Sequence, residues 1–207
     1  MKNAVVLLSG GLDSTTTLAL AVKESKSTQA ISFRYGQLHS VELEYAAYQA
    51  KNFKVVHKII DIPTISGSHL TDGGGIKEAN IPNTYVPARN TLFLSFALSV
   101  AEPIDADIWI GVNAIDYSGY PDCRPEFIQA FQTLANLGTR KGLMGNGPCV
   151  RTPLQNLNKV EIIKLARRLG VDYKNTISCY FPINGTPCMK CDSCGIRRAA
   201  FSEFDLL

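Results

Sequence analysis

A loop of small residues follows the first apolar run of the chain. It reads Ser9-Gly10-Gly11-Leu12-Asp13-Ser14 and leads into a helical pattern. Glycines let consecutive backbone N–H groups face a ligand, and a helix N-terminus adds a favourable partial charge. The loop therefore predicts a phosphate-binding site. It lacks the Gly-Lys-Ser/Thr of a Walker loop and the spacing G-x-G-x-x-G, which disfavours cleavage between the β and γ phosphates and dinucleotide binding.

The loop instead matches the pattern S-G-G-x-D-S of pyrophosphate loops. In enzymes that carry this loop, a substrate oxygen attacks the α-phosphorus of ATP and the loop holds the departing pyrophosphate. Asp13 is then expected to help hold Mg²⁺, which offsets charge on the leaving oxygens. A plain strand-to-helix connection with Ser14 as N-cap is the alternative interpretation. The residues predicted to contact ATP are Leu8, Ser9, Gly10, Gly11, Leu12, Asp13, Ser14 and Thr15.

A second chemical pattern is a cluster of cysteines near the C-terminus. Its members are Cys179, Cys188, Cys191 and Cys194, with the spacing C-x8-C-x2-C-x2-C. Four thiolates this close in sequence complete one tetrahedral shell, so they predict a single structural Zn²⁺ that attaches the C-terminal helix to the domain. The last three also match part of an iron–sulfur ligand run, and buried thiols are a third interpretation.

The bulk composition restricts the kind of protein. The chain has 207 residues, 45% of them hydrophobic and 19% charged, which is enough for one globular domain. Its net charge of +3 is scattered, so no nucleic-acid partner is expected. The sequence contains no signal-peptide pattern and no apolar run long enough to span a membrane, and four of its six cysteines are clustered. We therefore expect a cytoplasmic protein.

Strand and helix patterns alternate along the chain, which predicts an α/β fold with a doubly wound parallel sheet. Residues 1–170 are expected to form the ATP-binding catalytic domain, and residues 171–207 a zinc-binding helical appendage of the same domain. The expected strands are Asn3–Leu8, Thr28–Tyr35, Lys54–Ile60, Asp107–Gly111 and Val150–Pro153. The expected helices are Ser14–Glu24, Val41–Asn52, Asn90–Val100, Glu126–Leu137, Asn158–Leu169 and Ser193–Phe204.

Two long connections are candidates for ligand binding. Asp61–Ala88 is rich in Pro, Gly, Ser and Asn and is long enough to be a working loop or lid. Val112–Pro125 follows a strand at the carboxyl edge of the sheet, where open α/β sheets bind ligands. Between them, Asn90–Val100 is almost entirely apolar and is expected to be buried on most sides.

Together these motifs resemble the 7-cyano-7-deazaguanine synthase family of the queuosine pathway, within the adenine nucleotide alpha hydrolase-like fold. The further motifs that carry the resemblance are Tyr-Gly-Gln-x-His at 35–39, Val-Pro-Ala-Arg-Asn at 86–90, and the segment 116–127. The resemblance implies that 7-carboxy-7-deazaguanine is adenylated by ATP and that ammonia displaces AMP to give the amide. A second ATP then activates the amide for dehydration to the nitrile. It also implies a homodimer.

Several polar and aromatic residues in these motifs are candidates for substrate binding or catalysis. Arg89, Lys159 and Arg124 are suited to bind phosphate or the substrate carboxylate. His39 is a candidate general base, although a lone His is usually structural. The guanine-like ring would be read or stacked by residues among Asp116, Asp122, Glu126, Tyr35, Tyr117, Tyr120 and Phe127. Gln37 and Asn90 complete the list of substrate-binding candidates.

The sequence departs from the family pattern at two positions. Met189 replaces the glycine of the usual Cys-Gly-x-Cys, which puts the local turn in doubt more than the metal. Leu38 replaces the arginine of Tyr-Gly-Gln-Arg-His, which could alter substrate handling.

Three other functions stay open at this point. A tRNA sulfurtransferase would use Cys123 or Cys149 as sulfur carrier, but the sequence has no basic RNA-binding surface. A relative that stops at the amide would need the same pocket and the same ATP chemistry. A non-catalytic nucleotide-binding module would not need Asp13 or Arg89.

Overall fold

The computed structural model describes residues 1–74, 81–114 and 119–203. Within these ranges, one parallel sheet of five strands forms the centre of the molecule, in the order β3-β2-β1-β4-β5. The strands are β1 (Asn3–Leu7), β2 (Thr28–Arg34), β3 (Val56–Asp61), β4 (Ala106–Trp109) and β5 (Val150–Arg151). The predicted doubly wound parallel sheet is confirmed.

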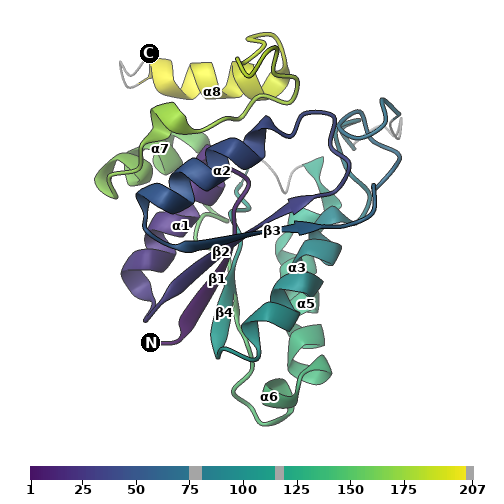
Figure 1. The fold of residues 1–207 in the computed structure, drawn as a ribbon, viewed down its shortest axis with the longest axis vertical. Coiled ribbons are helices and arrows are strands. Elements are labelled where there is room, and N and C mark those ends of the chain that lie inside the picture. The colour runs from purple at the N-terminus through teal and green to yellow at the C-terminus, as the bar shows by residue number, and fades with distance from the viewer. Residues whose placement is uncertain (75–80, 115–118, 204–207) are drawn as a thin grey trace.

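Helices cover both faces of this sheet. The helices are α1 (Leu12–Glu24), α2 (Val41–Asn52), α3 (Arg89–Ala101), α5 (Pro125–Gly138), α6 (Arg140–Leu143), α7 (Lys159–Arg168) and α8 (Asp192–Ser202). Two 3₁₀ turns are η1 (Pro121–Cys123) and η2 (Tyr173–Asn175). Helices α1 and α2 lie on one face, and α3 and α5 lie on the other (Figure 1). The short helix α6 was not predicted, and the other helix ends agree with the predicted ends within about two residues.

The alternation of side chains along β1 determines which layer each residue joins. Val5 and Leu7 pack in the core beneath α3 and α5, whereas Ala4, Val6 and Leu8 pack against α1 and α2. Successive strand residues point to opposite faces, so a strand covered on both sides must be apolar throughout. This explains the short continuous apolar run that precedes the glycines.

The chain changes from one face of the sheet to the other between β1 and β4. These strands are neighbours and pair in parallel, but they lead to helices on opposite faces. At such a switch point, the loops after the two strands separate and leave a crevice at the carboxyl ends of the strands. The nucleotide loop follows β1, and Gly111 follows β4, so both border this crevice.

Two details differ from the sequence prediction. Strand β3 begins at Val56 rather than Lys54, because Lys54 has a φ of 56° and belongs to the turn that follows α2. Helix α3 was expected to be buried on most sides, and this was wrong. Leu92 and Phe96 are each 40% exposed, and Leu94 and Ala97 form its buried side.

The C-terminal segment packs on the main body through its own small core. Helix α7 contacts α1, and α8 contacts α7. Their interface contains Leu12, Ile162, Ala166 and Phe201. The division of the chain after residue 170 stays a prediction. Among the residues that the structure describes, no helix is long and apolar enough to cross a membrane.

Candidate functional site

The nucleotide loop is a tight turn held by its own hydroxyl groups. The Ser9 amide donates a hydrogen bond to Ser14 Oγ at 3.1 Å, and Ser14 Oγ donates to the Gly11 carbonyl at 3.2 Å. Gly11, not Ser14, is the N-cap of α1. Gly10 has a φ of 77°, and a Cβ there would overlap the carbonyl oxygen of Glu42. The loop is therefore fixed against α2, with the N-terminus of α1 at the crevice.

Asp13 lies in the first turn of α1 and is the centre of a polar cluster. Lys159 Nζ donates to Asp13 Oδ2 at 2.7 Å, and Asn113 Nδ2 donates to the same oxygen at 3.0 Å. The other carboxylate oxygen, Oδ1, is buried and has no hydrogen-bond partner among the described residues. A buried carboxylate oxygen is costly without a partner, so this oxygen is suited to a cation or a bound water.

Lys159 reaches Asp13 because helix α7 begins at a well-defined point. The Asn158 side chain accepts from the Glu161 amide at 3.0 Å, and the Glu161 carboxylate accepts from the Asn158 amide at 2.8 Å. The predicted capping box is therefore confirmed. It makes Lys159 the first residue of the helix and directs its side chain toward the nucleotide loop.

A cavity of about 300 Å³ opens beside the loop at the switch point. The nucleotide loop, the end of β2, the start of α3 and the segment after Thr176 all border it. Leu70 and Thr84, from the connection between β3 and α3, also line it, which agrees with the prediction of a working loop there. Of the residues predicted to contact ATP or to bind or convert the deazaguanine substrate, the lining contains Leu8, Ser9, Gly11, Leu12, Asp13, Ser14, Tyr35, Gln37, His39, Arg89, Asn90, Tyr120 and Lys159.

Part of the cavity wall is aromatic and carries a cation, Arg89. Arg89 lies over the rings of Tyr35 and Phe93, at 5.9 and 5.8 Å from their centroids. Burial opposes the charged form of Arg89, but Tyr35 and then Asp122 outweigh it and raise the pKa of this side chain. Arg89 therefore keeps its charge in an apolar surrounding, where an anionic ligand is attracted strongly.

Asn90 and Asp122 hold helix α3 in place. The Asn90 amide donates to Asp122 Oδ2 at 2.9 Å, and Asn90 Nδ2 donates to the Asp122 carbonyl at 3.0 Å. Asp122 is 6% exposed and does not line the cavity. Its carboxylate thus satisfies the N-terminus of α3, which Ala88 cannot cap with a side chain.

The other predicted substrate residues lie in several surroundings. Arg124 and Glu126 are exposed at the start of α5, outside the cavity lining. Phe127 packs against Phe131 and the core beneath α5.

Tyr120 lines the cavity, and its hydroxyl lies 2.7 Å from Thr84 Oγ1. His39 is exposed at the cavity and contacts Phe181 edge-on. Asp116 and Tyr117 lie outside the described residues.

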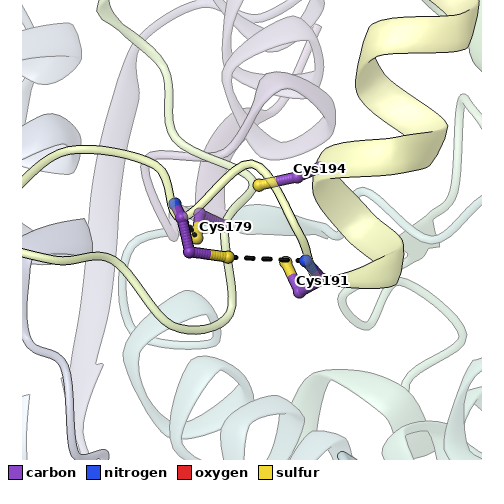
Figure 2. Close-up of side chains that lie close together, drawn as sticks. Cys179, Cys191 and Cys194 are labelled. Atoms are coloured by element: carbon purple, nitrogen blue, oxygen red, sulfur yellow. Dashed lines mark hydrogen bonds between the residues drawn. The ribbon is translucent and has the colours of Figure 1, made fainter.

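The four predicted cysteines come together in one cluster. Their sulfur atoms all lie within 4.8 Å of one another, and Figure 2 shows Cys179, Cys191 and Cys194 close together beside the start of α8. The sulfur atoms around Zn²⁺ would be about 3.8 Å apart for Zn–S bonds of about 2.3 Å. Backbone N–H groups of Lys190 and Cys191 lower the pKa of the Cys188 thiol to about 6. The donor set fits a tetrathiolate metal site.

The cysteine segment also forms part of the cavity wall. The Ile177 amide donates to the Gly10 carbonyl at 3.1 Å, and Ser178, Cys179 and Tyr180 line the cavity. Arg197 of α8 donates to Thr176 Oγ1 at 3.0 Å and to Ser178 Oγ at 3.1 Å. The helix that carries Cys194 is thus connected to the nucleotide loop through one short stretch of backbone.

Some residues of the site were not found from the sequence. Asn113 lies four residues after the end of β4, and a polar residue soon after a buried strand was a usable signal for it. Glu42 lies in the first turn of α2, where an acidic residue is common for helix reasons alone. Ser178 and Tyr180 had no local signal, because only tertiary packing brings them to the loop.

Comparison with known proteins gives consistent matches. The sequence model of the family described as "Queuosine biosynthesis protein QueC" matches residues 3–205. The 7-cyano-7-deazaguanine synthase of Stutzerimonas stutzeri is 53% identical over 214 aligned positions, which cover 99% of this chain and 96% of the relative. The corresponding protein of Pelobacter propionicus is 52% identical, with 100% and 96% covered. The structure of NMN synthetase from Francisella tularensis gives a TM-score of 0.52 at 16% identity over 100% of this chain and 78% of that one, a similarity of fold.

Proposed function

Because the chain belongs to the queuosine biosynthesis protein QueC family, we propose that it is a 7-cyano-7-deazaguanine synthase. The reaction is the ATP-dependent conversion of 7-carboxy-7-deazaguanine and ammonia to the nitrile, through an adenylated acid and an amide. The observation that carries this proposal is the cavity that the nucleotide loop, Asp13 with Lys159, and the aromatic wall with Arg89 border together.

The residues around the loop are suited to the transfer of AMP to an oxygen atom. The substrate carboxylate oxygen attacks the α-phosphorus, and the bond to pyrophosphate breaks. Backbone N–H groups of the loop and the Lys159 ammonium would stabilise the charge on pyrophosphate, and Arg89 would hold the carboxylate. Asp13 Oδ1 is available to hold Mg²⁺, which supplies further charge neutralisation when it is bound.

The second round would use the same groups. Ammonia attacks the acyl carbon of the adenylate and AMP leaves, which produces the amide. The amide oxygen then attacks the α-phosphorus of a second ATP and displaces pyrophosphate. Loss of AMP together with the two amide protons gives the nitrile. Each round releases pyrophosphate from one ATP, and the negative charge on it develops at the same loop. One set of backbone N–H donors therefore serves both rounds.

We also infer that the cysteine cluster holds one structural Zn²⁺. Four sulfur donors leave no open position for a substrate, which supports a structural role. The cysteines are free thiols, which supports a reducing, cytoplasmic location. A homodimer is inferred from the family resemblance alone.

The test is to incubate the purified protein with 7-carboxy-7-deazaguanine, ATP, Mg²⁺ and ammonium, and to follow product mass and AMP together. We expect the nitrile with two AMP per product. Accumulation of the amide alone would indicate an arrested relative, and the absence of AMP would reject the proposal.

A further inference from the structure

The carboxylate of Glu42 is a feature of the cavity that the steps above do not use. It lies in the first turn of α2 and lines the cavity. Gln37 Nε2 donates to Glu42 Oε1 at 3.1 Å. Gln37 is itself fixed, because it also donates to the Phe33 carbonyl at 3.1 Å and its Oε1 accepts from the Tyr35 amide at 2.8 Å. The position of the Glu42 carboxylate is therefore set by β2 and its following turn.

Few carboxylates are available to a ligand in this cavity. Among the described residues of its lining, the acidic ones are Asp13 and Glu42. Asp13 is engaged by Lys159 and lies at the phosphate end. Asp122, an earlier candidate for reading the base, satisfies the N-terminus of α3 instead. Glu42 is thus the remaining described carboxylate that can face the ring of a bound substrate.

The electrostatic surrounding of Glu42 favours a ligand that donates hydrogen bonds. Burial is the largest influence and raises the pKa of Glu42, while Arg89 and Gln37 act in the opposite direction. No ion pair within 4.0 Å joins Glu42 to Arg89 in the described structure. A carboxylate withdrawn from water gains most from N–H donors that arrive with the ligand.

We propose that Glu42 determines specificity for the deazaguanine ring by accepting hydrogen bonds from its N1–H and its exocyclic amino group. This inference rests on the proposed function. A guanine-type edge carries two adjacent donors, which match the two oxygens of one carboxylate. An adenine edge presents a donor beside an acceptor, and a hypoxanthine-type edge lacks the amino group. The site therefore selects the substrate ring against other purine-like rings.

The position of Glu42 also brings this ring close to the phosphates. The Glu42 backbone is in contact with Gly10 of the nucleotide loop, so the recognition turn and the phosphate loop are adjacent. Arg89 lies on the same aromatic wall, with Tyr35. A ring held by Glu42 at its pyrimidine edge can direct its carboxylate, on the opposite edge, away from α2 and toward the cations of the site.

The experiment measures binding of two ligands to three proteins by calorimetry without ATP. The ligands are 7-carboxy-7-deazaguanine and the analogue that lacks the exocyclic amino group. The proteins are the unsubstituted chain, Glu42→Gln, and Glu44→Gln, which removes an exposed carboxylate from the same helix turn. For Glu42→Gln we expect affinity for the substrate to fall by about 10- to 100-fold, as for loss of charge-assisted hydrogen bonds. Glu44→Gln should bind like the unsubstituted chain.

The ligand pair separates recognition from folding. The unsubstituted chain should bind the analogue at least about 10-fold more weakly than the substrate, and Glu42→Gln should lose most of that preference. Its affinity for ATP should change by less than about 3-fold. The proposal is overturned if Glu42→Gln keeps the preference, or if it weakens ATP binding and not substrate binding. If Glu42→Gln does not fold, equal binding of the two ligands by the unsubstituted chain also overturns it.

The same data distinguish this inference from the proposed function. If the unsubstituted chain neither binds 7-carboxy-7-deazaguanine nor forms AMP with it, the proposed function is wrong. If it binds and converts this substrate but Glu42→Gln behaves like Glu44→Gln, the proposed function stands and the role of Glu42 is rejected.

Discussion

The nucleotide loop and the cysteine segment border the same cavity, but they are stabilised in different ways. The loop lies between β1, where Val5 and Val6 are fully buried, and the first turns of α1. The cysteine segment, residues 179–194, contributes few buried side chains, since Ile183 is 65% exposed and Met189 is 54% exposed. Its internal contacts are mainly between cysteines and backbone amides. The loop depends on the central sheet, whereas we expect the segment to depend on a metal ion held by its four cysteines.

Because of this difference, we expect substitutions in the loop to change turnover and substitutions in the cysteine cluster to change stability. A side chain at the loop can be removed without opening the core, so its loss should affect turnover alone. A cysteine of the cluster helps to order the segment that forms the cavity wall, so its loss should affect stability first and activity as a consequence. The following substitutions test this contrast in order of expected effect.

The largest effect is expected for Asp13→Ala. We expect turnover to fall by about 10³-fold or more, because Lys159 and the expected cation lose the carboxylate that positions them. The melting temperature should shift by only a few degrees, since the lost ion pair is partly exposed. Pyrophosphate release and thermal melting measure the two effects. Glu44→Ala is the control, and retained pyrophosphate release in Asp13→Ala would remove Asp13 from this role.

A large loss of stability is expected for Cys191→Ser. Loss of one of four sulfur ligands should release the metal and destabilise the protein by roughly 3–5 kcal/mol. Metal analysis and thermal melting test this. Cys149→Ser changes a cysteine outside the cluster and should leave both unchanged. An unchanged melting temperature and full activity for Cys191→Ser would reject the structural metal.

Arg197→Ala tests the connection between the two regions. The substitution removes hydrogen bonds to Thr176 and Ser178 and should cost about 2 kcal/mol. Ile177, which lies between Thr176 and Ser178, donates a hydrogen bond to the Gly10 carbonyl of the nucleotide loop. We therefore also expect a higher KM for ATP. Arg198→Ala removes an exposed cation from the adjacent position and serves as the control. Equal behaviour of the two variants in denaturant unfolding and ATP kinetics would show that the connection does not matter.

The smallest effect is expected for Met189→Gly. Met189 has a φ of 60°, a left-handed conformation that glycine adopts without strain, so the substitution should stabilise the protein by up to about 1 kcal/mol. Met144 is similarly exposed but has a φ of −86°, so Met144→Gly should be neutral or destabilising. Urea unfolding compares the two, and equal shifts would mean that the turn at Met189 is not strained.

The sequence predicted the parts of this molecule that depend on local patterns. The strands and helices, the loop at Ser9, the capping box at Asn158 and the cysteine spacing are all patterns of residues close together in the sequence. The turn at Met189 also had a signal in the sequence, because the family has glycine at this position. In the structure Met189 has a positive φ, the backbone conformation that glycine favours. Such features follow from backbone geometry and side-chain chemistry at neighbouring positions.

The composition of the cavity wall could not be predicted in the same way. Asp13 and Lys159 are 146 residues apart in the chain, and the sheet order brings them together. Asp122 lies in the polar loop at the carboxyl edge of the sheet and Glu126 lies just after it, but sequence alone does not determine which of these side chains face the cavity. Glu42 resembled an ordinary acidic residue at the start of a helix, so its position in the wall became clear only from the packing of α2 on Gly10.

The contact at Gly10 also has a thermodynamic consequence. The glycine leaves no gap between the nucleotide loop and α2, and a methyl group there would meet backbone atoms of Glu42 and Ala46. We therefore expect ordering of the loop by ATP to be coupled to ordering of the helix turn that carries Glu42. Linkage is reciprocal, so a ligand that orders this turn must strengthen ATP binding by the same factor. We therefore expect ATP and the deazaguanine substrate to bind cooperatively through this contact, in addition to any effect of their direct contact during the reaction.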